Sequence, residues 1–222
     1  MRYRLSEIGL LFRTPLGRRQ LRVHLYSRTW PFWDALGRIY RRTLARQVKI
    51  IAVVGSYGKT TTATVLQQAL GLKWLNVSGK GLSQIAIAVL GLRPRQAPGV
   101  IEVAINRRGQ MRRHARTLRP DVVVLTSIGS EHHRSLGDKD TIRDEKAKIL
   151  GGLTPGGIVI SNGDDVRVQQ IPIPPGARHI RFGFAPRCDI RASDVVVEWP
   201  HGLRFTLHVG ADRHVVVAER PC

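Results

Sequence analysis

The sequence predicts an α/β fold in which helices flank a mostly parallel β-sheet. Short runs of β-branched apolar residues alternate with segments of helical composition between residues 49 and 160, as in repeated strand–helix–strand units. A turn containing glycine joins the first of these strands directly to a helix. After residue 171 strands follow one another with only short turns between them. This change predicts an antiparallel β tail on the same sheet.

The elements can be placed in chain order. Residues 1–47 are expected to form two or three helical stretches, broken near residues 15–17 and 30–31. Strands are predicted at residues 49–54, 74–77, 100–104, 121–125 and 157–160, and helices at 62–70, 82–90, 110–118 and 140–150. The run 121–125 is nearly all valine, which is typical of a strand buried on both faces. The tail strands are predicted at residues 194–198, 203–209 and 214–218.

Length and composition indicate a globular protein with one core. The chain has 222 residues, of which 42% are hydrophobic, an ordinary value for a globular domain. Two cysteines, Cys188 and Cys222, do not make a disulfide framework. They favour a reducing, cytoplasmic compartment. No apolar run approaches the 18 residues of a transmembrane helix, and we expect neither a membrane span nor a secretory signal.

The net charge of +20 is concentrated at the amino end. Residues 1–49 hold 12 Lys or Arg, only two acidic residues and 7 of the 13 aromatic residues. We therefore expect a basic, aromatic helical extension, residues 1–48, followed by a domain at residues 49–222. The extension suits packing on the domain, with arginine stems along apolar surface, or contact with an anionic membrane at the inner face. Nucleic acid is the weakest of the three interpretations because the chain has no nucleic-acid-binding motif.

Residues 55–62, Gly-Ser-Tyr-Gly-Lys-Thr-Thr-Thr, have the composition of a phosphate-binding loop. Gly55 and Gly58 let backbone N–H groups approach an anion at the start of a helix, where the helix dipole favours negative charge. Lys59 adds a full positive charge, and the hydroxyl of Thr60 is placed to ligate Mg²⁺. We expect Lys59 to be exposed without ligand. The longer phosphate-loop pattern needs glycine at Val53, so an ordinary strand-to-helix turn is the alternative.

Three further residues indicate a cation site. Glu102 interrupts an apolar strand, where a carboxylate is costly to bury unless it is paired or bound to metal; the alternative is an edge strand with Glu102 facing water. His132 follows the valine strand, at the end where open α/β sheets bind ligands. Lys146 shares a predicted helix face with apolar residues, so it either extends to solvent or has a function such as carbamate formation. We expect Glu102, His132 and Lys146 to converge beside the glycine loop.

These segments resemble, in order, the motifs of the central ATP-binding domain of the Mur ligases. Those enzymes join amino acids to a UDP-sugar peptide in peptidoglycan synthesis. Residues 55–62 resemble the family's G-T/S-N-G-K-T-T-T loop, and residues 102–111 resemble the E-x-G-x-N-x-x-G-E-[IM] segment of the D-alanyl-D-alanine-adding branch. Residues 120–137, 145–149 and 162–165 are similar to three further motifs of that branch. The resemblance covers residues 49–218.

The resemblance implies an ATP- and Mg²⁺-dependent ligase. Such an enzyme phosphorylates a substrate carboxylate to an acyl phosphate, which an amine attacks to form an amide. Lys59 would hold the β- and γ-phosphates, and Thr60 and Glu102 a Mg²⁺ ion. His132 and a carbamylated Lys146 would hold a second ion. The implied nucleotide-binding residues are Gly55, Ser56, Tyr57, Gly58, Lys59, Thr60 and Thr61. The implied partners are ATP, a UDP-sugar peptide or other carboxylate acceptor, and an amino acid or dipeptide.

The chain departs from the family pattern in several places. Tyr57 replaces an asparagine, Ala104 replaces a glycine, and residues 78–83 differ from the branch's G-N-x-N-N run, so the substrate contacts need not be those of the branch. The basic extension stands where the family has a UDP-sugar-binding domain, and the chain stops near the start of the family's G-x-H-N-x-x-N segment. We therefore expect an incomplete ligase, truncated or frameshifted. Two alternatives are a basic membrane- or nucleic-acid-associated module without turnover, and an enzyme completed by another chain.

Overall fold

The computed structural model describes residues 9, 13–18, 20, 28–72, 78–79, 82–94, 98–130, 137–199 and 202–218. The helices within these residues are α3 (Trp30–Arg42), α4 (Lys59–Ala69), α5 (Leu82–Leu90), α6 (Gln110–Leu118), α8 (Lys139–Ala147), the 3-10 helix η1 (Lys148–Gly152) and α9 (Val166–Gln169). The strands are β1 (Ile50–Val54), β2 (Ser78–Gly79), β3 (Gly99–Val103), β4 (Val122–Leu125), β5 (Ile158–Asn162), β6 (Arg178–Gly183), β7 (Ile190–Glu198), β8 (Gly202–Val209) and β9 (Asp212–Ala218).

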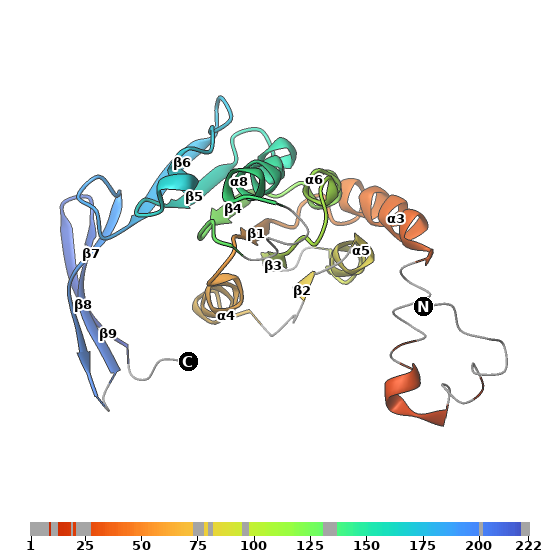
Figure 1. Cartoon of the computed structure of the whole chain (residues 1–222), viewed down its shortest axis with the longest axis horizontal. Coiled ribbons are helices and arrows are strands. Elements are labelled where there is room, and N and C mark those ends of the chain that lie inside the picture. Colours follow the sequence, from red (N-terminus) through yellow and green to blue (C-terminus); the bar gives the residue numbers. More distant parts are fainter. Residues whose placement is uncertain are drawn as a thin grey trace.

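The described strands form one sheet of nine, in the order β2-β3-β1-β4-β5-β6-β7-β8-β9. Every pairing from β2 to β7 is parallel. The last two pairings, β7 with β8 and β8 with β9, are antiparallel. The predicted fold class, a mostly parallel sheet with flanking helices and an antiparallel β tail, is therefore confirmed (Figure 1).

Helices cover both faces of the parallel part of the sheet. Ile50, Ala52 and Val54 of β1 point to one face, where they join a large apolar cluster with residues of α5, α6, α8, η1 and α9. The alternate residues Ile51 and Val53 point to the other face and pack with α4. Figure 1 shows α4 on one side of β1 and β3, and α6 and α8 on the other side. This two-sided burial explains why β1, β3 and β4 are continuous apolar runs.

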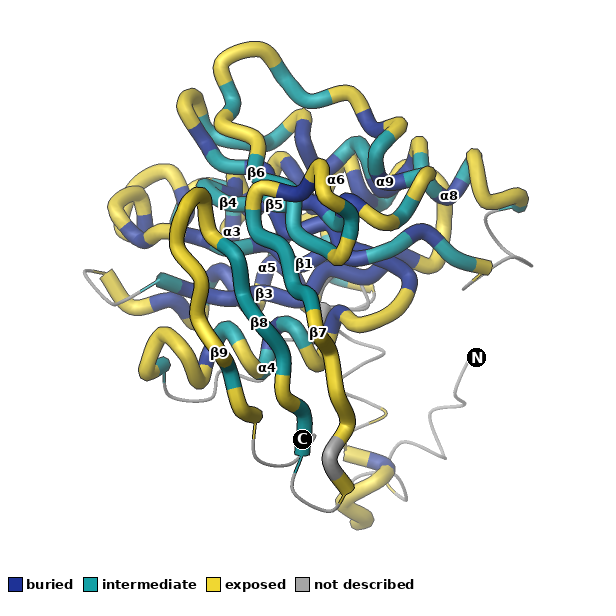
Figure 2. Tube along the Cα trace, turned by 90° about the vertical axis from the view of Figure 1, so that its left-hand side faces the viewer, coloured by how far each residue is buried: buried dark blue, intermediate teal, exposed yellow. Residues whose placement is uncertain are grey.

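The antiparallel tail is much less buried than the parallel part. The residues of β9 are exposed except for one of intermediate exposure. In Figure 2 the strands β7 to β9 are mostly teal and yellow while β1 and β3 are dark blue, and Figure 1 shows the tail apart from β1 and β3. The tail therefore extends the sheet beyond the core.

Most predicted elements agree with the observed ones to within a few residues. The predicted helix at residues 140–150 divides into α8 and η1, and residues 15–18, near a predicted break, are helical. The predicted strand at 74–77 lies outside the described residues. Neither β6 nor α9 was predicted from the sequence. The strand β6 contains two arginines and a histidine, and only its pairing with β5 identifies it as a strand.

Helix α3, within the predicted extension, packs against α5 and α6. An added Cβ on Gly37 would lie 3.3 Å from the Cα of Ala86, so the small residue permits close approach to α5. Arg41 is 4% exposed, and its guanidinium donates to the carbonyl oxygens of Leu118 (2.8 Å) and Val48 (3.0 Å). Of the three interpretations of the extension, packing on the domain is the one that the structure shows for α3. Among the described helices, none combines the length and the apolar character that crossing a membrane requires.

Candidate functional site

The glycine loop connects β1 to α4 and occupies residues 55–58. Gly58 has φ 77°, a left-handed conformation that costs other residues energy. An added Cβ on Gly55 would lie 1.9 Å from Oγ1 of Thr126, so packing also requires glycine at this position. Both glycines are therefore needed, for different physical reasons.

The segment that follows β4 holds the glycine loop in place. The N–H of Ser56 donates to the carbonyl oxygen of Ser127 (2.7 Å), and the N–H of Tyr57 donates to Oγ of Ser127 (3.0 Å). The hydroxyl of Thr126 donates to the carbonyl oxygen of Tyr57 (2.7 Å). These contacts use the first N–H groups of the loop internally. The helix α4 begins directly after these residues, and an α-helix does not satisfy the N–H groups of its own first turn, which favours an anion there.

Tyr57 lies over the same segment. An added Cβ on Gly129 would be 2.2 Å from the Tyr57 ring, and the Tyr57 hydroxyl is 3.3 Å from Oγ of Ser130. Tyr57 stands where the family motif has an asparagine. Its ring has room because residue 129 is a glycine and has no side chain.

Lys59 is 7% exposed and begins α4. Its Nζ donates a hydrogen bond of 2.7 Å to the carbonyl oxygen of Ser56, so the side chain folds back over the loop. The expectation that Lys59 is exposed without ligand is wrong. A buried ammonium group needs oxygen ligands, and the loop supplies one.

Glu102 lies in β3, between β2 and β1, and is 7% exposed. Because β3 has a strand on each side, the alternative of an edge strand with Glu102 facing water is wrong. Its Oε2 accepts a hydrogen bond of 2.8 Å from Oγ1 of Thr60. A carboxylate and a hydroxyl, both hard oxygen donors, thus lie together at the start of α4.

Lys146 lies near the end of α8 and is 3% exposed. Its Nζ donates to the carbonyl oxygen of Gly55 and, at 3.2 Å, to Oγ of Ser56. The side chain therefore points to the glycine loop and does not extend to solvent. Together with the contacts of Lys59 and Glu102, this brings side chains from three elements to residues 55–60.

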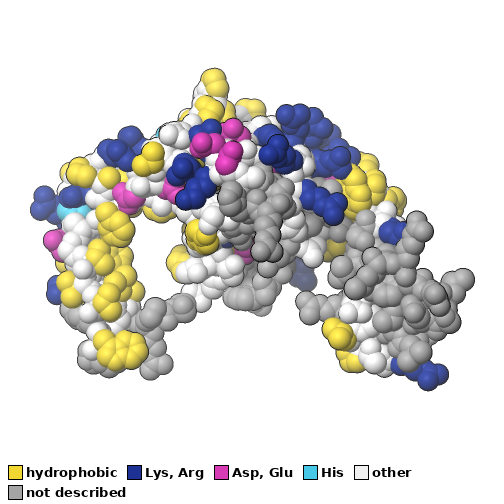
Figure 3. Space-filling view, in the orientation of Figure 1, with side chains coloured by type: hydrophobic (Ala, Val, Ile, Leu, Met, Phe, Trp, Pro, Cys, Tyr) yellow, Lys and Arg dark blue, Asp and Glu magenta, His cyan; other side chains and the backbone are white. Residues whose placement is uncertain are grey.

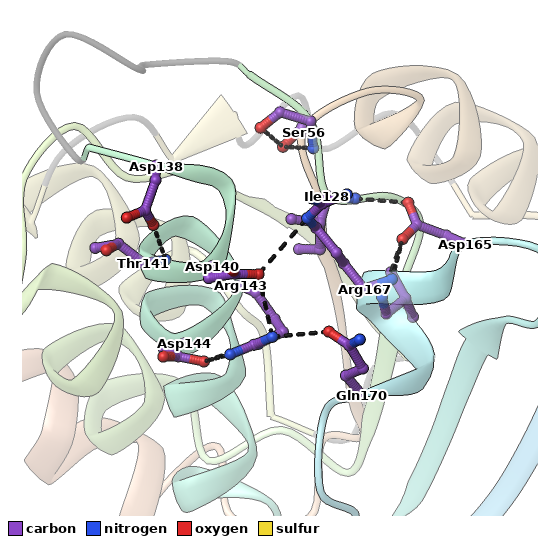
Figure 4. A network of polar contacts seen from close by, with 12 residues as sticks. Ser56, Ile128, Asp138, Asp140, Thr141, Arg143, Asp144, Asp165, Arg167 and Gln170 are labelled. Atoms are coloured by element: carbon purple, nitrogen blue, oxygen red, sulfur yellow. Dashed lines mark hydrogen bonds and ion pairs between the residues drawn. The ribbon is translucent and has the colours of Figure 1, made fainter.

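Polar contacts connect α8 to its neighbours and thereby position Lys146. Arg143 donates to the side-chain oxygen of Gln170 (2.8 Å), and Arg167 pairs with Asp140 (3.6 Å). Figure 4 shows this network beside Ser56. At the other end of α8, the buried carboxylate of Glu145 accepts from the N–H of Met111 (3.2 Å) and pairs with Lys148. No role was predicted for Glu145 from the sequence, because its burial is visible only in the structure.

Asp165 connects the segment after β4 to the end of β5. Its Oδ2 accepts from the N–H of Ile128 (2.9 Å), while its Oδ1 accepts from the N–H groups of Arg167 and Val168 at the start of α9. In the sequence, Asp165 stands out only as part of the segment 162–165, which is similar to a family motif. An aspartate directly before a helix is a capping signal, which would have identified the contacts with Arg167 and Val168 but not the one with Ile128.

His132 lies outside the described residues, as does the rest of the segment 131–136. Within the described part of the chain, no three His, Cys, Asp or Glu side chains cluster as metal ligands would. The structure therefore places Lys59 and Lys146 on the glycine loop and pairs Glu102 with Thr60, and the place of His132 stays a prediction.

Four features occur together here: a parallel α/β sheet, a glycine loop, a lysine at the start of the next helix and a buried carboxylate in a strand. This combination is typical of phosphate-loop proteins. Residues 53–218 match the family described as "Mur ligase middle domain". The chain belongs to this family.

Relatives and solved structures specify the branch. The chain is 29% identical over 152 residues to the UDP-N-acetylmuramoyl-tripeptide–D-alanyl-D-alanine ligase of Bacillus subtilis, a match that covers 67% of this chain and 33% of the relative. The crystal structure of MurF from Acinetobacter baumannii aligns with a TM-score of 0.76 at 25% identity, covering 86% of this chain and 42% of that one. The MurF ligase of Thermotoga maritima, solved in complex with ADP, shares the fold (TM-score 0.73, 20% identity) and covers 85% and 44%. This is a MurF-like Mur ligase sequence. It spans less than half the length of these proteins.

Proposed function

We propose that residues 49–222 bind ATP and Mg²⁺ as the central domain of a MurF-like ligase that forms an amide bond, with residues 1–48 as an extension. The observation that carries the proposal is that Lys59 and Lys146 contact one glycine loop, with the Thr60–Glu102 pair at the start of the helix α4 that follows the loop. The family match supports it. The solved relative with ADP supports the nucleotide.

The residues present fit a Mg²⁺ ion. Mg²⁺ prefers oxygen ligands and is commonly held by one or two carboxylates together with substrate phosphates. The Thr60 hydroxyl and the Glu102 carboxylate, 2.8 Å apart, are such donors. We propose that they hold one ion, and that Lys146, carbamylated, and His132 hold a second. When bound, the ions would neutralise charge on the transferred phosphoryl group.

The lysine and the backbone of the loop then have separate roles in phosphoryl transfer to a carboxylate. Lys59 would exchange its bond with the Ser56 carbonyl oxygen for the β- and γ-phosphates, where its charge stabilises developing negative charge. Residues 55–61 would line the phosphate site, and backbone N–H groups at the start of α4 would donate to the phosphates. The resulting acyl phosphate is attacked by an amine to give the amide. The names of the relatives suggest a UDP-sugar peptide as the carboxylate acceptor and a dipeptide as the amine, in the cytoplasm, where ATP is available.

Titration calorimetry with ATP, with and without Mg²⁺, tests the proposal. Lys59→Ala should lower ATP affinity roughly a hundredfold, because a charge-assisted phosphate contact is lost. Thr60→Val should remove most of the gain in affinity that Mg²⁺ provides. Lys139→Ala, which removes an exposed lysine at the start of α8, is the matched control and should bind as the parent does.

Melting curves of each variant separate binding from folding, which matters because Lys59 is buried. Parental ATP affinity in a folded Lys59→Ala variant would contradict the assignment of the loop. Salt-dependent binding to lipid or nucleic acid with no ATP binding at all would favour the alternative of a module without turnover.

A further inference from the structure

Helix α3 rests on the domain through its polar side. The buried residues of the helix are Asp34, Gly37 and Arg41. Thr117 of α6 donates a hydrogen bond to Asp34, and Arg41 donates to the carbonyl oxygens of Leu118 and Arg119 and to Asp121. A surface helix ordinarily turns its apolar stripe to the core and its charged residues to water. In α3 the fully buried side chains are instead those of Asp34 and Arg41, and Tyr40 packs partly buried against the apolar cluster.

The opposite side of α3 is an apolar stripe that faces solvent. Phe32, Leu36 and Ile39 follow one another at intervals of four and three residues, so they lie on one helix face. Phe32 is 62% exposed, Ile39 60% and Leu36 37%. Leu44, just after the helix, is 64% exposed. Single exposed apolar residues need no explanation, but a continuous stripe of them indicates a contact surface.

Arginines border this stripe. Arg42 and Arg46 are exposed, and the exposed arginines of α6, which packs against α3, are Arg112, Arg113 and Arg116. Figure 3 shows apolar side chains gathered over α3 next to a group of Lys and Arg side chains. Asp34 is the only acidic residue between positions 8 and 101, and it is buried. The surface is therefore both apolar and strongly cationic.

We propose that the outer face of α3 docks on an anionic membrane surface. Phe32, Leu36 and Ile39 would enter the boundary between headgroups and acyl chains, while Arg42 and Arg46 contact anionic headgroups. Nucleic acid would match the arginines but would leave the apolar stripe in water. A lipid surface satisfies both halves of the pattern, and in the described part of the chain the stripe is exposed while α3 stays packed through its other side.

Co-sedimentation of the whole chain with lipid vesicles tests the proposal. The chain should bind vesicles of phosphatidylcholine mixed with phosphatidylglycerol and should bind pure phosphatidylcholine weakly. The double variant Phe32→Ser/Ile39→Ser should lose at least about tenfold in affinity for the anionic vesicles. The matched control Val215→Ser/Val217→Ser alters two residues of β9 that are 70% and 59% exposed, and it should bind as the parent does.

The charged half has its own experiment. Arg42→Gln/Arg46→Gln should weaken binding to the anionic vesicles by up to about fivefold per arginine at low salt, and by less at high salt. Equal binding to both kinds of vesicle would overturn the proposal. So would parental binding by a folded Phe32→Ser/Ile39→Ser variant, because residues 1–27 would then carry the contact. Leu44→Ser, outside the helix, is a second apolar variant that should also weaken binding.

Discussion

At the scale of single residues, the site is notable for lysines that turn inward. Lys59 and Lys146 both donate to carbonyl oxygens of the glycine loop, Ser56 and Gly55 respectively. Partial charges on carbonyl oxygens compensate a buried ammonium less completely than phosphate oxygens would. An anion bound at the loop would therefore be strongly attracted by both lysines, which supports the proposed nucleotide site.

His114 is the buried residue whose charge state should affect stability. It is 1% exposed, and in the described part of the chain its Nε2 is one of two buried side-chain atoms with no hydrogen-bond partner. Burial lowers the pKa of His114 from 6.5 to about 4. The unfolded chain therefore binds more protons between these pH values, and the contribution of neutral His114 is complete above pH 6.5 and lost as the pH falls through 4.

This difference predicts a measurable pH dependence. Between pH 7 and pH 4.5 the free energy of unfolding of the parent should fall by roughly 2–3 kcal/mol more than that of His114→Gln, which cannot titrate. Urea unfolding at several pH values measures both. Parallel pH profiles for parent and variant would contradict the assignment of a depressed pKa to His114.

At the scale of elements, the glycine loop and the segment after β4 form one unit. Gly55→Ala places a methyl group 1.9 Å from Thr126 Oγ1 and 3.0 Å from the Ser127 nitrogen, so one of the two segments must move. We expect a loss of stability of about 1–3 kcal/mol together with weaker ATP binding. Gly151→Ala is the control, because an added Cβ there meets nothing within 4 Å. Unchanged melting and ATP affinity in Gly55→Ala would show that the loop is not fixed by this contact.

A second element-scale prediction concerns the attachment of α3. Arg41 donates to the carbonyl oxygens of Leu118, Val48 and Ala45 and pairs with Asp121 at 3.0 Å. Arg41→Ala leaves these acceptors buried without their donor and should cost about 3–5 kcal/mol of stability. Arg42→Ala, one residue along and exposed, should cost less than about 0.5 kcal/mol. Similar denaturation midpoints for the two variants would show that Arg41 does not anchor the helix.

At the scale of the whole molecule, α3 is part of the packed structure. Helix α5 is largely apolar, and its residue Ala86 is buried against Gly37 of α3. Deleting residues 1–45 removes α3 and exposes this surface, so the shortened chain should aggregate or melt at a lower temperature. Deleting residues 1–27 keeps α3 and should leave melting close to that of the parent. Solubility and calorimetry compare the two. A soluble, fully stable chain without residues 1–45 would contradict the structural role of α3.

The parallel sheet and its glycine loop were predictable from the sequence alone. Strands buried on both faces must be continuous apolar runs, so β1 and β4 stand out without any tertiary information. A strand, two glycines and Lys59 in that order predict the phosphate-type turn. Glu102 and Lys146 were recognisable because charged residues in apolar surroundings are costly unless they have partners.

Only the tertiary structure decided how those residues are satisfied. The direction of Lys59 depends on the carbonyl oxygen of Ser56, and the need for glycine at position 55 depends on Thr126, which is distant in sequence. The orientation of α3 could not be read from its periodicity, because an apolar stripe ordinarily faces the core. Its polar side is buried because Thr117, Leu118 and Asp121 supply specific partners for Asp34 and Arg41. Such partners are long-range contacts, and no local sequence pattern encodes them.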